Sequence, residues 1–402
     1  MTMAGAATRV CVGVVAPQTG RLAPLGEPLS FAVRTLARRL TRLHNSGRTY
    51  DVRIAVRDSR SHPEGARLAV HELADDEGAN IVLTMAGTQV LPAAADTCEQ
   101  LGVPCVSTTF PWQAYGCARG GDPLRSFRWT YHFAWGLDDI ATVFADMWEQ
   151  LGPRHTVGCL WNDGLQGRLL RHERFGFTPV AAARGHTLVD PGGYPEPATG
   201  FDSHLARLRD HGADILTSAA TAADLALFLR QARTTGPVPR LITCSRWLTY
   251  PPTHTTRSPD VHRELAGASV ATMVYWSPEH PYRSSLDGTG CAELARAYRE
   301  ETGQLWLQPL GLAHALFEVA HHALATALDP TDRAAVAQAL AKTRTDTVVG
   351  PLDWTQGPTP NIALVPLAGG QWRQGPDGPR LTLVSNTRAP AVPLTGDVVA
   401  AR

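Results

Sequence analysis

The sequence is poor in lysine and has no excess of either charge. Lys342 is the only lysine among 37 basic residues, and 37 acidic residues balance them to a formal net charge of zero. Nothing therefore favours nucleic acid or an anionic membrane surface as a partner. No apolar run reaches the roughly 18 residues that a membrane-spanning helix needs. The first ten residues lack the basic and apolar regions of a signal peptide, so we expect a cytoplasmic location.

Cysteine is scarce and scattered, with seven residues and no C-x-x-C pair. This pattern argues against a disulfide framework and against a zinc site. Cys98 and Cys105 are near enough in sequence to approach each other, but free thiols in a reducing compartment are the favoured interpretation. The motifs G-x-S-x-G, H-E-x-x-H and G-x-G-x-x-G and the P-loop are missing. We therefore predict no cofactor, no metal and no familiar catalytic signature.

What the sequence does contain is a regular alternation of strands and helices. Its 402 residues are too many for one compact core and predict two domains. The alternation predicts an α/β protein with parallel sheets and helices on both faces. The first series has predicted strands at 9–16, 50–57, 79–83 and 104–107, and helices from Gly26 to His44, at 63–76, and from an N-cap at Thr88 to Leu101. The second series has predicted strands at 156–161, 185–190, 214–218, 240–243 and 271–276, with helices at 165–175, 201–211, 222–235, 291–302, 310–327 and 333–343.

An aromatic stretch, Trp129–Asp139, separates the two series and predicts the first crossing of the chain between two lobes. Ala271–Trp276 predicts the second crossing, and Thr347–Gly350 the third. In open α/β sheets, ligands lie beyond the carboxyl ends of the strands, so we expect the loops there to line a ligand cleft. The predicted domains are 9–128 plus 277–347 for the first lobe and 129–276 plus 348–402 for the second, after an N-terminal tail of residues 1–8.

A series of short motifs runs in order through the chain. They are Val12–Gly20, Asp58-Ser59, Leu101–Ser107, Phe110–Trp112, Trp129–Phe133, Trp135–Asp138, Trp276–Tyr282, His314–Glu318 and Gly370–Trp372. Together they resemble the leucine/isoleucine/valine-binding protein family of ABC-transporter solute receptors, and in particular a subgroup for aromatic or branched substrates. The resemblance implies the type I periplasmic-binding fold, in which two Rossmann-like lobes joined by crossing strands close over a ligand.

The resemblance also implies ligand contacts in the first lobe. The amides of Gly87 and Thr88 would face a ligand carboxylate, because amides at a helix N-terminus suit an anion. The segment Ser107–Phe110 follows the next strand and supplies a second group of contacts. Over both lobes, the predicted ligand-binding residues are Thr19, Gly87, Thr88, Thr108, Thr109, Phe110, Trp135, Gln166 and Arg246.

In the second lobe, the implied contacts are Asp163–Gln166 and the loops around Ala220 and Arg246. Two residues depart from the family pattern. Amino-acid-binding members generally place an acidic side chain near the last loop, where this chain has Arg246, and Leu165 replaces an aromatic residue. We expect Arg246 to pair with a carboxylate, a phosphate or an aromatic acid rather than with a bare ammonium group.

Several of these residues have simpler structural explanations. Capping of the following helix would explain both Thr88 and Asp163. Core packing would explain at least half of the rings in Trp129–Trp135, although His132 and Trp135 remain possible ligand contacts. Four residues at helical spacing could bind a metal, but we favour a place for them in a lobe core. They are His314, Glu318, His321 and His322.

Three functional hypotheses follow. The favoured one is a cytoplasmic clamshell that binds an amino-acid-like or aromatic acid and serves as a biosynthetic enzyme. A Pictet–Spengler condensation of an aromatic amine with an aldehyde would need little beyond orientation and a base, for which Asp163 and Glu27 are the candidates. The second is a solute receptor coupled to an ABC permease. The third is a ligand sensor that regulates a partner protein.

Overall fold

The computed structural model describes residues 8–247, 259–375 and 378–401. The chain forms two compact units. The first consists of the residues up to Trp135 together with Trp276–Val365, and the second of Gly136–Tyr275 together with the residues from Pro366 onward. The chain therefore passes between the units three times.

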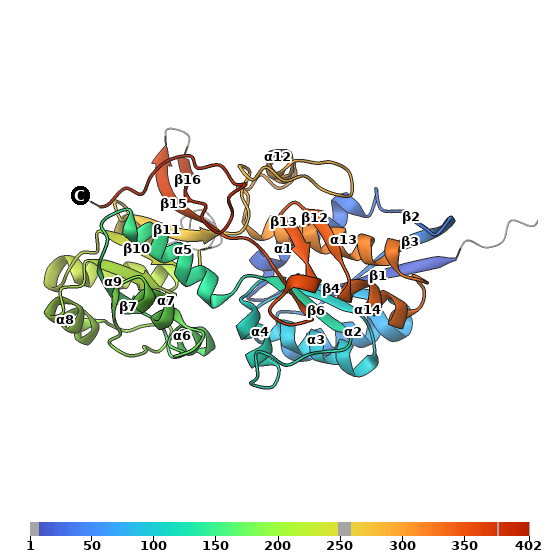
Figure 1. The fold of residues 1–402 in the computed structure, drawn as a ribbon, viewed down its shortest axis with the longest axis horizontal. Helices are drawn as coiled ribbons and strands as arrows, with labels where there is room; N and C mark the ends of the chain where they lie inside the picture. The colour runs from blue at the N-terminus through green and yellow to red at the C-terminus, as the bar shows by residue number, and fades with distance from the viewer. Residues whose placement is uncertain (1–7, 248–258, 376–377, 402) are drawn as a thin grey trace, which may run out of the picture. The chain divides into compact units, whose positions relative to one another are not determined.

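The first unit is built around a seven-stranded sheet with the order β14-β6-β5-β4-β1-β3-β2, in which only β2 runs antiparallel to its neighbour (Figure 1). Every residue of β1 except Arg9 is buried, as its apolar sequence predicts. Helices α1 and α13 cover one face, and α2 and α3 cover the other. The strands are β1 (Arg9–Ala16), β2 (Arg42–Asn45), β3 (Arg48–Asp58), β4 (Ile81–Met85), β5 (Cys105–Thr108), β6 (Thr130–Ala134) and β14 (Ile362–Leu364). The helices are α1 (Ala23–Leu36), α2 (Pro63–His71) with a π turn at Glu72–Asp76, α3 (Val90–Leu101), α4 (Trp112–Ala118), α12 (Cys291–Thr302), α13 (Pro309–Thr326) and α14 (Arg333–Ala341). A small hairpin, β12 (Arg344–Thr347) and β13 (Gly350–Asp353), precedes a 3-10 turn at Trp354–Gln356.

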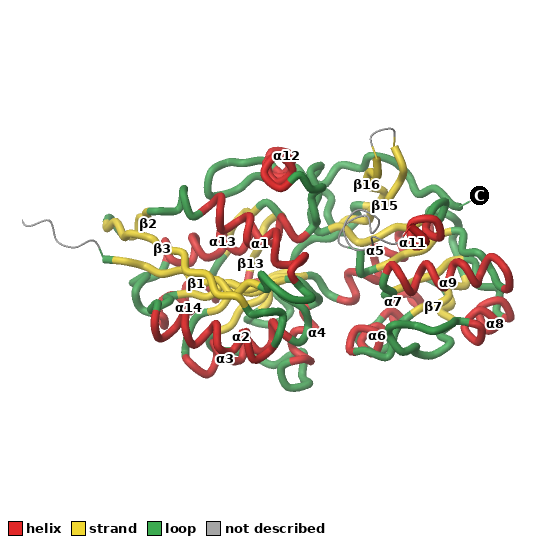
Figure 2. Tube along the Cα trace, turned by 180° about the vertical axis from the view of Figure 1, so that it is seen from behind, coloured by secondary structure: helices red, strands yellow, loops and turns green. Residues whose placement is uncertain are grey.

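The second unit has its own seven-stranded sheet, with the order β16-β15-β11-β10-β9-β7-β8. Its five strands from β11 to β8 are parallel, and β15 and β16 add an antiparallel edge. Helices α5 and α7 pack together on one face, and α8, α9 and α11 lie on the other (Figure 2). The strands are β7 (Thr156–Leu160), β8 (Thr187–Val189), β9 (Ile215–Ser218), β10 (Leu241–Cys244), β11 (Val270–Val274), β15 (Ala368–Gly375) and β16 (Gly378–Ser385). The helices are α5 (Leu137–Glu149), α6 (Leu165–Leu170), α7 (Phe177–Ala183), α8 (Asp202–Asp210), α9 (Ala222–Thr235) and α11 (Pro259–Leu265). The predicted architecture of two α/β lobes is confirmed.

Three local predictions were wrong. The helix expected to reach His44 ends at Leu36, because Ser46 and Gly47 adopt positive φ angles of 46° and 77° and turn Arg42–Asn45 back onto β3 as a hairpin. The helix expected at 165–175 ends at Leu170. The segment Thr347–Gly350 closes the β12–β13 hairpin, so it is not the third crossing.

The third passage between the units lies at Val365 and Pro366 instead. Consequently, 348–365 belongs to the first unit, where β14 pairs in parallel with β6. The aromatic stretch 129–135 also belongs there, because β6 pairs with β5 along its length. In this stretch Tyr131, Phe133 and Trp135 are all buried, so its rings serve mainly as core.

Helix α13 carries the cluster that was considered for metal binding. Ser284 Oγ and His314 Nε2 share a hydrogen bond of 2.7 Å, and the amides of Ser285 and Val348 donate to the Glu318 carboxyl group at 2.7 and 3.0 Å. These bonds fasten two loops to the helix. Burial raises the pKa of Glu318 to about 7. Among the described residues, no group of three potential metal ligands comes together, and no helix is long and apolar enough to cross a membrane.

Glu318 should make the stability of the protein depend on pH. Its folded-state pKa lies above its ordinary value of 4.5, so the folded protein binds an extra proton between these pH values. The stability that this group contributes is therefore full below about pH 4.5 and is lost as the pH rises through about 7. The variant Glu318→Gln cannot titrate at this position. We therefore expect the difference in free energy of unfolding between Glu318→Gln and wild type to shift by about 3 kcal/mol in favour of the variant from about pH 5 to pH 8. Urea unfolding at both pH values measures this, and a difference that does not change with pH would contradict it.

All seven cysteines are free thiols.

Candidate functional site

The carboxyl ends of β4 and β5 form a group of unused backbone donors in the first unit. The two strands are parallel neighbours, with Met85 opposite Thr108, so the residues that follow them lie at the same edge of the sheet. Within the described part of the chain, the amides of Gly87, Thr88 and Gln89 donate to no acceptor. They precede α3, whose N-terminal dipole end favours negative charge. This arrangement suits a carboxylate or another anion.

The predicted cap at Thr88 is wrong. Helix α3 begins at Val90, its N-cap is Gln89, and no side chain caps it. The turn is instead closed by the backbone, because the amides of Val90 and Leu91 both donate to the carbonyl of Gly87 at 3.1 and 3.0 Å. The Thr88 hydroxyl is therefore not used for capping.

Thr109 is the most unusual residue at this edge. Its φ angle is 133°, a region that β-branched residues rarely adopt, and such strain is concentrated at functional sites. Its hydroxyl oxygen is buried and has no hydrogen-bond partner among the described residues. The amides of Thr109 and Phe110 likewise have no acceptor there. One strained residue thus adds a hydroxyl donor to the amides that follow β4.

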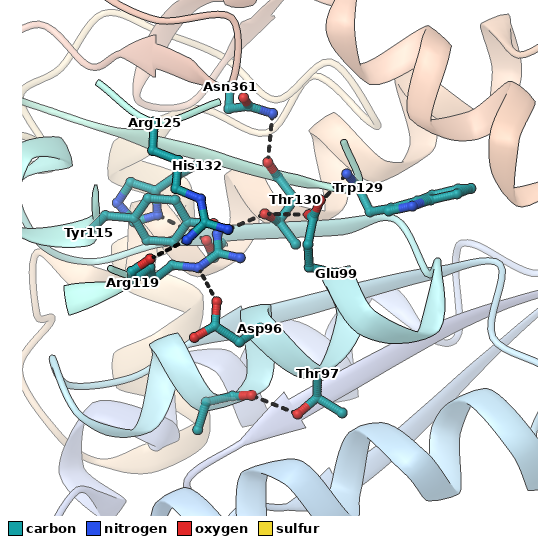
Figure 3. A network of polar contacts seen from close by, with 12 residues as sticks. Asp96, Thr97, Glu99, Tyr115, Arg119, Arg125, Trp129, Thr130, His132 and Asn361 are labelled. Atoms are coloured by element: carbon teal, nitrogen blue, oxygen red, sulfur yellow. Dashed lines mark hydrogen bonds and ion pairs between the residues drawn. The ribbon is translucent and has the colours of Figure 1, made fainter. Parts of the chain in front are cut away.

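The buried imidazole of His132 holds the segment Thr108–Phe110 by a hydrogen bond to Phe110, and it lies against Tyr115 (Figure 3). His132 Nε2 donates to the carbonyl of Phe110 at 3.0 Å, and His132 Nδ1 shares a hydrogen bond of 2.9 Å with Ser107 Oγ. The ring stacks on Tyr115 with a centroid distance of 4.3 Å. Burial lowers the pKa of His132 to about 3, so the ring is neutral at physiological pH. Both nitrogens are engaged, so His132 positions the loop and is not available to a ligand.

Arg119 anchors the same region. Its side chain is fully buried, and Nε donates to Asp96 at 2.7 Å, while Nη1 donates to Thr130 at 2.7 Å and to the Tyr115 hydroxyl (Figure 3). The guanidinium lies 3.7 Å from the centre of the Phe127 ring. These contacts tie α3, α4 and β6 together beneath the site. Arg119 was not among the predicted residues, because it lies in a stretch without a recognisable motif.

Other predicted residues of the first unit are already engaged. The Thr19 hydroxyl donates to Asp58 at 2.6 Å, and the Thr108 hydroxyl donates to the carbonyl of Phe133 at 2.7 Å. Glu27 accepts a hydrogen bond of 3.0 Å from Arg34 on the surface of α1. Trp135 is 1 % exposed. Of the predicted residues in this unit, the structure brings together Gly87, Thr88, Thr109 and Phe110.

In the second unit, the loops after four parallel strands meet at one ion pair. Arg246, which follows β10, forms a two-pronged pair with Glu196, with 3.1 Å between Nη2 and Oε1. Asn162, which follows β7, donates to Glu196 at 2.8 Å. Arg246 also donates to the carbonyl of Ala219 at 3.3 Å. The expected free cation is therefore neutralised by an acid that lies 50 residues away in sequence and that sequence analysis missed.

The predicted capping role of Asp163 is wrong, because Gly164 is the N-cap of α6 and no side chain caps it, whereas the role of Asp163 as a base stays a prediction. Its side chain is exposed, and its hydrogen bonds are made by the backbone, to Tyr194 and Arg168. The side chain that shapes the turn is Asn162, whose Oδ1 accepts from the amide of Gly164 at 3.0 Å. Nearby, Gln166 donates to Ser245 at 3.3 Å and lies at the same strand edge as the Arg246 pair.

Comparisons with known proteins agree with this fold. The family profile described as periplasmic binding protein matches residues 9–375. No curated protein sequence matches the chain. A solute-binding protein of Rhodopseudomonas palustris, solved with 4-hydroxybenzoate, is similar with a TM-score of 0.72 and 14% identity over 94% of this chain and 96% of that one. A second from the same species, solved with 3,4-dihydroxybenzoic acid, has a TM-score of 0.65 and 17% identity over 98% of both chains.

A substrate-binding protein of Desulfitobacterium hafniense, solved with leucine, has a TM-score of 0.68 and 17% identity over 93% of this chain and 99% of that one. At these identities, the structural similarity shows the fold alone. The family profile, however, covers most of the sequence, and the resemblance seen in the motifs is confirmed. The chain therefore belongs to the periplasmic binding protein family.

Proposed function

We propose that this protein is a solute-binding receptor for a small carboxylic acid, either an amino acid or an aromatic acid. The observation that carries the proposal is the group of unused donors at the carboxyl ends of β4 and β5. It comprises the amides of Gly87, Thr88, Gln89, Thr109 and Phe110 and the hydroxyl of Thr109. Unpaired donors at a helix N-terminus recognise a carboxylate without needing a cationic side chain. The bound ligands of the similar structures, 4-hydroxybenzoate, 3,4-dihydroxybenzoic acid and leucine, all contain a carboxyl group.

The Thr109 hydroxyl provides a direct test. Replacing Thr109 by valine keeps the size and branching of the side chain but removes the donor. Because a hydrogen bond to a charged group contributes about 1.5–3 kcal/mol, we expect the affinity for the ligand carboxylate to fall about 10- to 100-fold. Isothermal titration with 4-hydroxybenzoate and with leucine measures it. Thr109→Ser, which keeps the hydroxyl, is the matched control and should remain within a few-fold of wild type, and equal affinities in all three proteins would contradict the assignment.

The other functional hypotheses have less support. The favoured receptor function also implies a partner: a receptor of this kind would deliver its ligand to an ABC permease, which is the partner we propose. The condensing-enzyme hypothesis has no support from the comparisons, and of its two candidate bases Asp163 is exposed and Glu27 is paired with Arg34. The cytoplasmic location stays a prediction, which fractionation of native cells can test.

A further inference from the structure

Leu22 is the side chain that lies next to the proposed carboxylate donors of the first unit. A Cβ atom added to Gly87 would lie 3.4 and 3.6 Å from the two terminal carbons of Leu22. Apart from Gly87 and its two chain neighbours, no other atom of the described chain would lie within 4 Å of this Cβ. The unused amide of Gly87 is therefore bordered by one apolar side chain, and the space beside it is otherwise open.

The position of Leu22 follows from the order of the strands. β1 lies between β3 and β4 and runs parallel to both, so the loops that follow these three strands lie at one edge of the sheet. Leu22 belongs to the loop after β1, and Gly87 belongs to the loop after β4. Both residues lie in the first unit, so their contact does not depend on the second unit.

The loop after β1 is fastened to the turn after β3. The carboxylate of Asp58 accepts from the amide of Gln18 at 2.9 Å and from the hydroxyl of Thr19 at 2.6 Å. The hydroxyl of Ser61 donates to the carbonyl of Thr19 at 2.5 Å and accepts from the amide of Leu22 at 2.9 Å. Ser61 has a φ angle of 56°, which serine rarely adopts and which persists only where its surroundings stabilise it. Leu22 is thus held in place through its own backbone amide.

An apolar wall at this position distinguishes ligands by the atoms next to their carboxylate. An apolar group that packs on Leu22 is removed from water, which favours binding. A hydroxyl or ammonium group in the same place would lose hydrogen bonds to water and gain none from Leu22. Asp58, in the adjoining turn, does not replace that water, because it already accepts four hydrogen bonds, which is about the capacity of a carboxylate.

We propose that Leu22 is a specificity-determining residue, which favours ligands with apolar atoms next to the bound carboxylate and disfavours a polar substituent there. Ser61 is a positioning residue that acts through Leu22. The inference rests on the proposed function, since it concerns the group that carries the carboxylate. It narrows the preferred class to aryl and branched alkyl acids without a hydroxyl or amino group beside the carboxylate.

The test compares pairs of acids that differ only beside the carboxylate. One pair is 4-hydroxybenzoate and 2,4-dihydroxybenzoate, and the other is 4-methylpentanoate and leucine. Leu22→Ala removes the methyl groups and leaves room for water, whereas Leu22→Met keeps an apolar wall and is the matched control. In isothermal titration of the full chain, Leu22→Ala should shift the affinity ratio at least about 10-fold toward the member with the polar substituent. Leu22→Met should keep the ratio within a few-fold of wild type.

Ser61→Ala tests how Leu22 is held. It removes the hydroxyl that bonds Thr19 and Leu22, so it should shift the ratio in the same direction in wild type and have no further effect in Leu22→Ala. Independent effects of the two substitutions would overturn the positioning role of Ser61.

The remaining outcomes separate the specificity of Leu22 from the proposed function. If wild type binds a pair and Leu22→Ala leaves its ratio unchanged, even with both members weakened alike, Leu22 is only structural and the inference alone is overturned. If wild type binds none of the four acids, the proposed function itself is overturned.

Discussion

Replacing Arg119 by methionine is expected to lower the free energy of unfolding by about 3–5 kcal/mol, the usual effect of removing one partner of a buried charged network. Methionine fills much of the space but removes the donors to Asp96, Tyr115 and Thr130. It leaves the Tyr115 hydroxyl buried without this partner. Burial already raises the pKa of Tyr115 to about 12, so the phenol cannot recover stability by ionising at physiological pH.

Urea unfolding of wild type and Arg119→Met measures this loss. The matched control is Arg67→Met, because the ion pair of Arg67 with Glu64 is exposed, with side chains 48% and 75% accessible. Surface pairs of this kind contribute less than about 1 kcal/mol. Equal effects of the two substitutions would contradict the anchoring role of Arg119. Since the network also supports β6 beneath Thr108–Phe110, we expect Arg119→Met to weaken ligand binding as well.

Replacing Gly311 by alanine is expected to destabilise the protein by about 3 kcal/mol, the upper part of the usual range for overpacking. In an exposed helix, replacing glycine by alanine would raise the free energy of unfolding by up to about 1 kcal/mol. A loss of stability would therefore show that the new methyl group meets a packed neighbour. The reason is contact: a Cβ atom at Gly311 would lie 2.2 Å from Cγ of Trp276. Trp276 is fully buried, and its ring packs edge-on against Trp306, so it has little room to move.

Thermal and urea unfolding measure the effect of Gly311→Ala. Gly200→Ala is the control, because an added Cβ there meets only the end of the Gln231 side chain at 3.6 Å. We expect the control to remain within about 0.5 kcal/mol of wild type, as surface substitutions usually do. A stable Gly311→Ala variant would show that α13 can shift away from Trp276.

Sequence patterns were most informative where local signals were strong. The strand Arg9–Ala16 and the helices Ala222–Thr235 and Cys291–Thr302 have the predicted bounds, because each combines an apolar pattern with clear end signals. The hairpin at Arg42–Asn45 was missed, since its register depends on the turn at Ser46-Gly47 and on pairing with β3. Likewise, nothing local reveals that β14 joins the first sheet.

In the candidate sites, too, features that depend on long-range contacts could not be predicted from local sequence patterns. Gly87 and Thr88 were predicted by position from the family resemblance and from the helix that follows them, and the structure adds that their amides have no acceptor in the described chain. The strain at Thr109 is a property of the folded backbone and leaves no sequence signal. The pairing of Arg246 with Glu196 joins residues far apart in sequence, so Arg246 was interpreted as a free cation. The charge at the carboxyl end of β10 therefore depends on a long-range ion pair and cannot be read from the residue type alone.

The central claim is that the first unit holds a ligand by its carboxylate. Isothermal titration of wild type with 4-hydroxybenzoate and leucine, and with the methyl ester of each, tests it most directly. If the amides after β4 and the Thr109 donor recognise a carboxylate, at least one acid should bind at least about 10-fold more tightly than its ester, because charge-assisted hydrogen bonds are roughly twice as strong as neutral ones. Equal affinity of acid and ester, or no binding of either acid, would contradict the claim.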